Sequence, residues 1–335
     1  MARLRRADPG EPGFTRRRCG RGHTYLEPSG ETIDNTATRE RIQALAIPPA
    51  WRDVWICRDP LGHLQATGVD AAGRKQYLYH QRWRARRDRA KFEAMLEFAV
   101  TLPRLRRRLR RELRGDVLTR ERVLAGALTL LDLGLFRIGS ESYAEDNGSY
   151  GLVTLRKRHV EVGPRRLIFD FEAKGGRRRV QTVDDRTVRG LVAALKRRRG
   201  GGDRLLAYHA AGRWVPLHAE DVNDRLKELT GGDFSAKDFR TWNATALAAV
   251  GVAALDGSPS TSAARKRALA AVVRSVAEQL GNTPAVCRRS YIDPRVFDRF
   301  RTGHTIADTL APMEIDLDTP RQRERVEAAV IELLG

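Results

Sequence analysis

The chain has 335 residues, of which 41% are hydrophobic, so it can bury a sizeable core, and its length suggests about two domains. Lys and Arg number 62 against 42 Asp and Glu, and the resulting charge of +20 favours a polyanionic partner, most often nucleic acid, over an inert basic surface. The three cysteines are too few and too scattered for a disulfide framework, which indicates a reducing cytosol, and no apolar run is long enough for a membrane span or a secretory signal.

The first part of the chain predicts a basic arm followed by a small sheet. Residues 1–22 are rich in Arg, Gly and Pro and lack apolar periodicity, so we interpret them as a flexible basic arm. Residues 23–85 form the predicted N-terminal domain, an antiparallel β-sheet whose three short strands are separated by turn sequences; these strands are Val54–Cys57, Leu64–Thr67 and Gln76–Tyr79. Cys19 and His23 lack a second pair of ligands, so no zinc site is expected.

The last strand of this sheet carries residue types that suit DNA. Arg74 can hold a phosphate and Gln76 can pair with a base edge, while the period of two puts Tyr77 and Tyr79 on one face. The strand therefore predicts a surface that reads a groove, although an edge strand with two exposed tyrosines would give the same pattern.

Residues 90–335 form the second predicted domain, which is mostly helical. Leu105, Leu109 and Leu113 recur every four residues, which predicts an amphipathic helix. Seven arginines interrupt this pattern and predict a strongly basic face; they are Arg104, Arg106, Arg107, Arg108, Arg110, Arg111 and Arg114. The apolar segment Val123–Phe136 predicts a buried helix, so Arg137, which follows it, is anchored.

Short strands come next, and helices complete the chain. The strands are predicted at Val153–Arg156, His159–Val162, Leu167–Glu172 and Arg178–Val183, and Lys174 lies at the tip of the last hairpin. The helices are predicted around Val188–Leu195, Ala219–Leu229, Ala244–Leu255, Leu269–Leu280 and Pro320–Leu334. Arg240 lies at the start of the apolar helix, where the helix N-terminus favours an anion. The fold class expected from this order is α+β.

Tyr291 lies just after Arg288 and Arg289. A phenol with its ordinary pKa of about 10 is a poor nucleophile at neutral pH, but cationic neighbours favour the phenolate. A lone tyrosine in a basic segment is usually a half-buried side chain without a catalytic role, so a nucleophilic Tyr291 needs partners from elsewhere in the chain.

Three other residues could supply those partners. Arg137 and Arg240 could grip the non-bridging oxygens of a phosphodiester, and Lys174 could protonate the departing sugar oxygen. No acidic cluster suggests a two-metal site, which fits a reaction without metal. Four residues so far apart in sequence are, by themselves, a weak signal.

Five blocks in this order give a more specific signal; they are Gly73–Tyr79, Arg137–Gly139 with Tyr143, Phe171–Gly175, Lys237–Thr241 and Ser290–Tyr291. With these blocks the chain resembles the small, poxvirus-like bacterial type IB DNA topoisomerases of the tyrosine topoisomerase and recombinase superfamily, from about Tyr25 to about Pro294. The resemblance implies a small sheet domain and a larger helical catalytic domain that enclose duplex DNA as a C-shaped clamp.

The resemblance also implies the roles of individual residues. Tyr291 would be the nucleophile and Lys174 the general acid, with assistance from Lys237, while Arg137 and Arg240 would stabilise the transition state. DNA contacts are expected from Arg74, Gln76, Tyr77, Tyr79, Tyr143 and Arg288. Tyr291 would form a 3′-phosphotyrosyl bond, the DNA would rotate, and the 5′-hydroxyl would reseal the strand without ATP or a divalent metal. The implied protein is a cytoplasmic, nucleoid-associated monomer that prefers supercoiled DNA.

Asn282 departs from the family pattern, which usually has a His nine positions before the nucleophile. That His is expected to donate a hydrogen bond to a non-bridging oxygen, and a neutral Asn amide can donate the same bond. We therefore expect a working but slower site, with weaker pH dependence near the pKa of His. Asn243, where His is expected in many relatives, is a second departure and is assigned no role.

Two other functions fit parts of the sequence. A tyrosine recombinase uses the same Arg, Lys, Arg and Tyr residues, but it typically has His-x-x-Arg where this chain has Lys237-x-x-Arg240. A non-catalytic basic DNA-binding protein with a decayed site is conceivable because of Asn282. Only the topoisomerase also accounts for the Gln-Tyr-x-Tyr strand.

Overall fold

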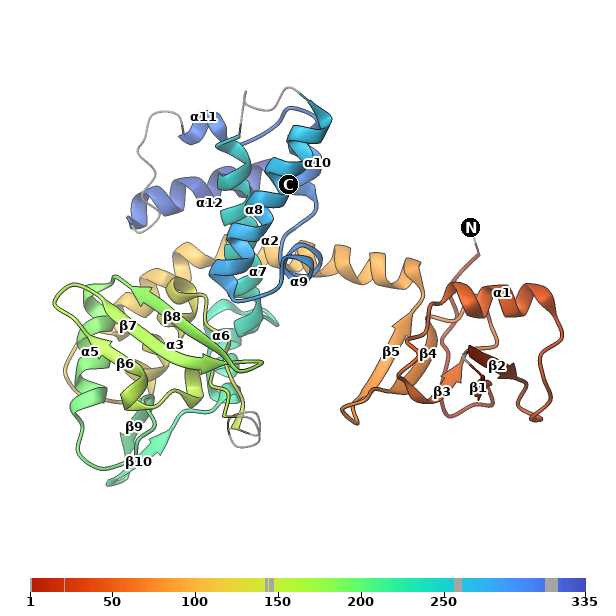
Figure 1. The fold of residues 1–335 in the computed structure, drawn as a ribbon. Helices are drawn as coiled ribbons and strands as arrows, with labels where there is room; N and C mark the ends of the chain where they lie inside the picture. The colour runs from red at the N-terminus through yellow and green to blue at the C-terminus, as the bar shows by residue number, and fades with distance from the viewer. Residues whose placement is uncertain (1, 21, 142–143, 145–147, 256–260, 311–318) are drawn as a thin grey trace. The chain divides into compact units, whose positions relative to one another are not determined.

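The structure is a computed structural model that describes the chain except residues 1, 21, 142–143, 145–147, 256–260 and 311–318 (Figure 1). Backbone contacts divide the chain into two units, Met1–Phe92 and Glu93–Gly335. The division falls inside helix α2 (Gln81–Glu112), a few residues beyond the boundary suggested by the sequence. The α+β class is confirmed, with an N-terminal antiparallel sheet and a larger, mostly helical unit.

The N-terminal unit is an antiparallel sheet of five strands in the order β2-β1-β3-β4-β5. The strands are β1 (Phe14–Cys19), β2 (Gly22–Leu26), β3 (Arg52–Ile56), β4 (Leu64–Val69) and β5 (Lys75–Tyr79). Helix α1 (Thr36–Ala44) begins where the Asn35 side chain accepts a hydrogen bond of 2.9 Å from the backbone N of Thr38. Apolar side chains of the sheet and α1 form the core of this unit, among them Phe14, Ile42 and Ile56.

The predicted flexible arm is wrong for Phe14–Cys19, because this segment is strand β1, which lies between β2 and β3. Its consecutive arginines are typical of a solvated basic segment, so the sequence did not predict the strand. The guanidinium of Arg16 explains part of the order, since it donates to the carbonyl oxygens of Pro48 and Trp51 at 2.7 and 2.8 Å. A cation can thus be an integral part of a sheet when backbone carbonyls satisfy its donors.

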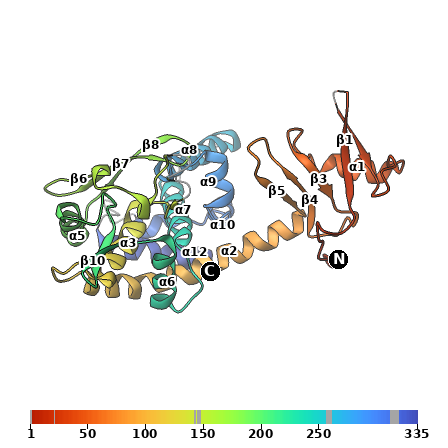
Figure 2. The same cartoon turned by 90° about the horizontal axis from the view of Figure 1, so that it is seen from below.

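The C-terminal unit surrounds a central helix. Its helices are α3 (Arg120–Gly134), α5 (Arg186–Arg197), α6 (Ala219–Thr230), α7 (Ala236–Ala253), α8 (Ser262–Leu280), α9 (Pro284–Ser290), α10 (Arg295–Arg301), α11 (Ala307–Leu310) and α12 (Pro320–Leu334). Its strands are β6 (Val160–Val162), β7 (Leu167–Ala173) and β8 (Arg177–Val183) in one sheet, and β9 (Ala207–Ala210) and β10 (Arg213–Pro216) in another. Helix α7 contacts α3, α8, α10 and α12, and Figures 1 and 2 show it near the centre of the unit.

The strand predicted at Val153–Arg156 is wrong, because Leu152–Thr154 is a short 3₁₀ turn. The backbone N of Leu152 donates to the carbonyl of Arg137 at 2.8 Å, so the turn supports the segment that follows α3. Gly139 has φ +88°, and a Cβ there would lie 2.9 Å from the Cα of Gly151. Two glycines therefore let these backbones approach closely enough to fix the main chain beside Arg137.

Helix α7 begins at Ala236, eight residues before the apolar run that predicted it. Arg240 therefore lies in its second turn and not at the helix start. The first turn of α7, whose N–H groups favour an anion, instead carries the exposed Lys237.

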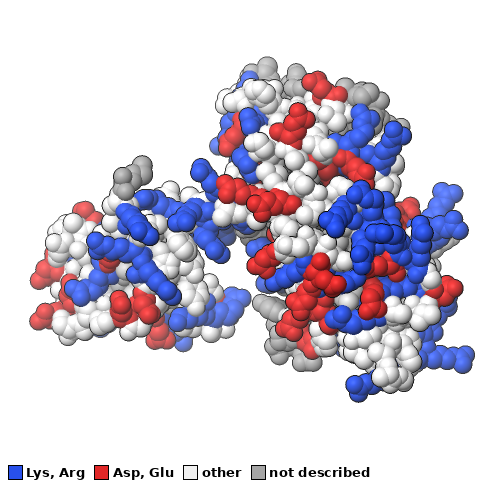
Figure 3. Space-filling model, turned by 180° about the vertical axis from the view of Figure 1, so that it is seen from behind, with Lys and Arg blue, Asp and Glu red and all other residues white. Residues whose placement is uncertain are grey.

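Of the seven arginines in the predicted basic face, five are exposed on α2, and the exposed Arg114 lies two residues beyond its end. Arg106 is the exception, because only 8% of its surface is exposed. Figure 3 shows Lys and Arg in patches on the surface, with acidic residues between them. The surplus of positive charge is thus not spread evenly, and one arginine of α2 is internal.

Candidate active site

Arg137 lies three residues after the end of α3 and contacts the loop between α8 and α9. Its Nη2 donates to the carbonyl of Gly281 at 3.1 Å and to the Oδ1 of Asn282. Burial lowers the pKa of Arg137, and the nearby Tyr291 phenol acts in the opposite direction. The sequence placed Arg137 on an anchored segment, and the structure joins it to Asn282, 145 positions later.

Arg240 is held by the ends of two helices. Its Nη1 donates to the carbonyl of Leu135, just after α3, and its Nη2 donates to the carbonyl of Leu280 at 2.9 Å. The centre of its guanidinium lies 5.3 Å from the centroid of the Tyr291 ring. Burial, followed by repulsion from Arg137, lowers the pKa of Arg240 to about 10. The group is therefore still a cation at neutral pH, and its orientation is fixed before any substrate arrives.

Tyr291 terminates α9, and its backbone is bound to α7. The Oγ1 of Thr245 donates a hydrogen bond to the carbonyl of Tyr291 at 3.2 Å, and this hydroxyl accepts one from the backbone N of Asp293 at 3.1 Å. Ile292 and Asp293 are fully buried, so the chain on the C-terminal side of the tyrosine is held firmly. Helix α7 thus positions both the phenol and the arginine beside it.

Asn282 lies at the turn between α8 and α9. Its backbone N donates to the carbonyl of Ala277 at 2.9 Å, after Gly281 has ended α8 with φ +64°. Its Oδ1 accepts from Arg137, and its Nδ2 is buried without a partner among the described residues. A buried amide donor that no protein group satisfies is the kind of group that the expected hydrogen bond to a phosphate oxygen requires.

Arg179 is a third arginine in this cluster, and the sequence analysis did not single it out. Its Nη1 donates to the carbonyl of Glu278 at 2.6 Å, in the last turn of α8. Burial, and then Arg137, lower the pKa of Arg179. The alternation of β8 gave a signal, because Arg179 shares its face with the buried Gln181 and Val183. Among the described residues, no carboxylate forms an ion pair with Arg137, Arg179 or Arg240.

Comparison with known proteins identifies the family of the chain. Residues 80–305 match the family model described as the catalytic core of eukaryotic DNA topoisomerase I, and residues 22–70 match the N-terminal domain of bacterial DNA topoisomerase IB. The DNA topoisomerase 1B of Acanthamoeba polyphaga mimivirus is 31% identical over 288 residues, which cover 84% of this chain and 85% of that protein. The chain belongs to the type IB DNA topoisomerase family.

More distant topoisomerases agree. The DNA topoisomerase 1B of vaccinia virus (strain Copenhagen) is 22% identical over 282 residues, or 82% of this chain and 85% of that protein. The DNA topoisomerase 1 of Candidozyma auris is 32% identical over 161 residues, which are 47% of this chain and 20% of that protein. Neither the recombinase nor the non-catalytic DNA-binding protein is supported. None of the described helices is long and apolar enough to cross a membrane.

The two lysines expected in the topoisomerase site lie on exposed positions. Lys174 lies in the turn between β7 and β8, at the tip of the hairpin that the sequence predicted. Lys237 lies on α7, about one turn before Arg240. Their roles in proton transfer stay predictions.

The expected DNA-reading strand is β5, in the N-terminal unit. Tyr77 and Tyr79 are 46% and 40% exposed on one face, as the period of two predicts, and their rings stack with centroids 6.2 Å apart. Gln76 is half-buried on the other face, and its Nε2 donates to Asp70 at 2.9 Å. Arg74 also binds the Asp70 carboxylate, at 2.9 Å. Base reading by Gln76 would therefore require it to exchange the Asp70 carboxylate for a base.

The remaining two predicted DNA contacts come from the C-terminal unit. Arg288 is exposed on α9, with its guanidinium 4.7 Å from the centroid of the Phe297 ring. Tyr143 lies outside the described residues. Both contacts stay predictions.

Replacing Arg179 by Ala is expected to slow single-turnover cleavage of a suicide DNA substrate roughly 10-fold, because the loop that carries Asn282 and Gly281 loses its tie to β8. Arg178→Ala is the matched control. Arg178 is the preceding residue, is exposed, and pairs with Asp170 at 2.6 Å. Cleavage at the same rate in both variants would show that Arg179 does not support the site.

Proposed function

We propose that this topoisomerase cleaves one strand of duplex DNA with Tyr291 and reseals it through a 3′-phosphotyrosyl intermediate. The proposal rests on one observation above all: the guanidinium of Arg240 lies 5.3 Å from the centroid of the Tyr291 ring, beside the hydrogen-bonded pair Arg137 and Asn282. A scissile phosphate placed there would meet a nucleophile, two cations and an amide donor at once.

In the proposed first step, the phenolic oxygen of Tyr291 attacks the phosphorus, and the bond from phosphorus to the 5′-oxygen breaks. The phenol gives up its proton to solvent water as the bond forms. Lys174 protonates the departing 5′-oxygen, assisted by Lys237. Arg137 and Arg240 offset the negative charge that develops on the non-bridging oxygens, and the Nδ2 of Asn282 donates a hydrogen bond to one of them.

The proposed second step reverses the first. The free 5′-hydroxyl attacks the phosphotyrosyl bond after the DNA has rotated, so the bond energy is conserved and torsional strain drives relaxation. We propose that the reaction needs neither ATP nor a divalent metal, and that the protein acts as a monomer in the cytoplasm, on supercoiled DNA of the nucleoid. The stacked Tyr77 and Tyr79 would contact the duplex.

The test is incubation of the protein with supercoiled plasmid in EDTA without ATP. A ladder of partly relaxed topoisomers supports the proposal. Absence of relaxation, or relaxation only after ATP or Mg²⁺ is added, would contradict it. Gel filtration combined with light scattering reports whether the active species is a monomer.

Replacing Lys174 by Ala is expected to slow cleavage by about 10²–10⁴-fold, because the 5′-oxygen then leaves without a proton donor. A 5′-bridging phosphorothiolate should restore most of the rate, since sulfur leaves without an acid. The variant should bind the normal substrate as tightly as the wild type. If the phosphorothiolate gives no rescue, Lys174 is not the general acid.

A further inference from the structure

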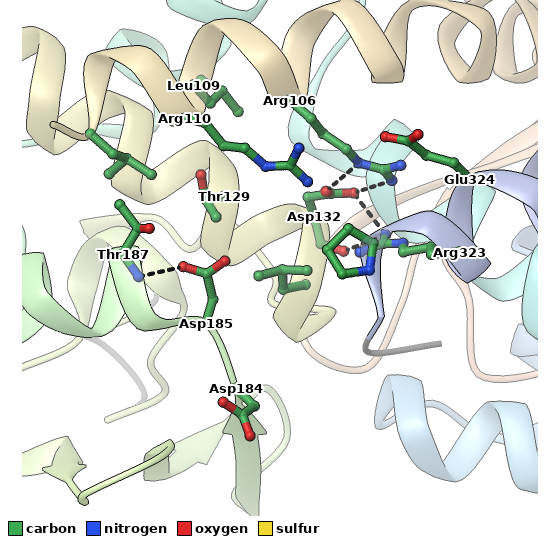
Figure 4. A pocket seen from close by; sticks show the side chains of 13 residues that line it. Arg106, Leu109, Arg110, Thr129, Asp132, Asp184, Asp185, Thr187, Arg323 and Glu324 are labelled. Atoms are coloured by element: carbon green, nitrogen blue, oxygen red, sulfur yellow. Dashed lines mark hydrogen bonds and ion pairs between the residues drawn. The ribbon is translucent and has the colours of Figure 1, made fainter. Parts of the chain in front are cut away.

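Three buried charged side chains and one half-buried arginine form a cluster in the C-terminal unit, which we call the ion quartet: Arg106, Asp132, Glu327 and Arg323. Arg106 binds Asp132 at 2.8 Å and Glu327 at 2.6 Å, and Arg323 binds the same two carboxylates at 2.8 and 3.1 Å. The four side chains are between 5% and 14% exposed. Figure 4 shows Arg106 and Arg323 converging on Asp132. Two cations and two anions balance, so the quartet is neutral.

The ion pairs stabilise the charges on Asp132 and Arg106 against the cost of burial. Burial works against ionisation of Asp132, but Arg323 and Arg106 lower its pKa below the ordinary value. Burial likewise opposes the charge on Arg106, but Asp132 and Glu327 raise its pKa. Asp132 and Arg106 are therefore both charged at neutral pH, and removing one partner of such a buried pair would leave the other charge uncompensated.

The quartet lies near Arg137 and Arg240. It includes a residue of α3, which precedes Arg137, and it is bound by residues of α7, which carries Arg240. Asp132 lies on α3, three residues before Leu135, whose carbonyl holds Arg240. On α7, two residues after Arg240, the Nε1 of Trp242 donates to Glu327 at 3.2 Å. Asn243, which had no assigned role, donates to the carbonyl of Asp132 at 2.9 Å and accepts from Arg323 at 3.0 Å. The quartet thus links α3 to α7 beside the active site.

Helix α12 supplies half of the quartet. Arg323 and Glu327 lie one turn apart on it, and Val326, Val330 and Leu334 are buried. At its other end, the carbonyl of Leu334 accepts from Arg295 at 2.8 Å, and Arg295 also pairs with Asp293, two residues after Tyr291, at 2.8 Å. One helix is therefore bound both to the arginine side and to the tyrosine side of the site. The match to the topoisomerase core ends at residue 305, so α12 lies beyond it.

Apolar packing alone does not fix this arrangement. Two cavities of about 60 and 260 Å³ flank the quartet, and Asp132, Leu133, Asp184 and Arg323 line both. The packing around the quartet is therefore incomplete, and the polar links contribute to holding α3, α7 and α12 together there.

We propose that α12 is a brace of the active site, in which Arg323 and Glu327 are positioning residues that keep α3 and α7 in register. The relative position of α3 and α7 determines where the guanidinium of Arg240 lies, because that group donates to the carbonyl of Leu135 at the end of α3. The position of α3 also determines where Arg137, three residues after its end, lies. The proposal rests on the assignment of these two arginines to the scissile phosphate.

The test is the double variant Arg323→Met with Glu327→Met. It removes one cation and one anion, so the Arg106–Asp132 pair stays neutral, and Met preserves the length and helix propensity of the side chains. The expected result is a single-turnover cleavage rate at least roughly 10-fold lower at saturating protein, with unchanged DNA affinity, because small displacements of catalytic groups are costly. A phosphorothiolate substrate should not restore the rate, in contrast to Lys174→Ala.

Val330→Ala is the matched control, because it weakens the packing of α12 without touching the quartet. It should melt at a lower temperature and yet cleave at the wild-type rate. A folded double variant that cleaves normally, or a control that is slowed equally well below its melting temperature, overturns the proposal. If the double variant does not fold, Glu327→Gln is measured instead. It should also cleave more slowly and bind DNA with unchanged affinity, and a wild-type cleavage rate in this variant overturns the proposal. Failure of the wild type to form an adduct would instead refute the proposed function.

Discussion

Replacing Tyr291 by Phe is expected to abolish both the covalent DNA adduct and plasmid relaxation. The variant loses only the phenolic oxygen, which is the atom proposed to attack phosphorus. The ring remains, and with it the contact with the Arg240 guanidinium at 5.3 Å. The backbone hydrogen bond from Thr245 also remains, so the fold and the affinity for DNA should not change. The measurement is adduct formation on a suicide substrate, resolved by denaturing gel, together with DNA affinity and thermal melting.

Tyr208→Phe, in strand β9, is the control for removing a tyrosine hydroxyl elsewhere in the same unit, and it should form adduct at the wild-type rate. An adduct on Tyr291→Phe that maps to a different residue would assign the nucleophile to that residue. A loss of DNA affinity together with activity would leave the role of Tyr291 in chemistry unsupported.

Replacing Arg240 by Ala is expected to reduce the single-turnover cleavage rate by about 10²–10³-fold or more, the usual cost of losing a fixed donor to a developing anion. Arg240→Lys should recover little of this. A lysine cannot satisfy the carbonyls of Leu135 and Leu280 and also present a planar donor pair to a phosphate. The binding of uncleaved DNA should change far less than the rate, because the effect belongs to the transition state.

Arg198 provides an informative control for this experiment. Like Arg240 it is a buried arginine whose guanidinium donates to backbone carbonyls, including those of Leu195 at 2.9 Å and Leu205 at 2.8 Å. Arg198→Ala should therefore cost stability in a similar way while leaving cleavage at the wild-type rate. Equal losses of rate in both variants, measured well below their melting temperatures, would mean that Arg240 matters only for folding.

Local patterns in the sequence predicted much of the fold. The alternation in β5 put Tyr77 and Tyr79 on one exposed face, and the Lys174-Gly-Gly turn located the β7–β8 hairpin. These features depend on residues close together in sequence, so a short window contains the whole signal. Arg137, Arg240, Asn282 and Tyr291 were found by residue chemistry and by resemblance, and the structure brings these four together.

The errors arose where distant residues decide the structure. Arg106 was assigned to the basic face, yet it lies four residues after Leu102 and three before Leu109, on the buried stripe of α2. Helical spacing alone would have placed it inside, but its charge argued against burial. Its partner Glu327 is 221 positions away, and no local pattern could reveal a compensating carboxylate at that distance. Strand β1 was missed for a similar reason, because the carbonyls that accept from Arg16 come from Pro48 and Trp51.

The cluster of Arg137, Arg179 and Arg240 has a consequence for the balance between stability and activity. Burial lowers the pKa of all three, and repulsion from Arg137 further lowers the pKa of Arg179 and of Arg240. None of the three pairs with a carboxylate among the described residues. In the DNA-free protein these like charges therefore oppose folding, whereas a bound phosphate neutralises them. Substitutions that remove these arginines would therefore stabilise the DNA-free protein and at the same time remove groups that the reaction needs. The negative charge that balances the arginines comes from the substrate.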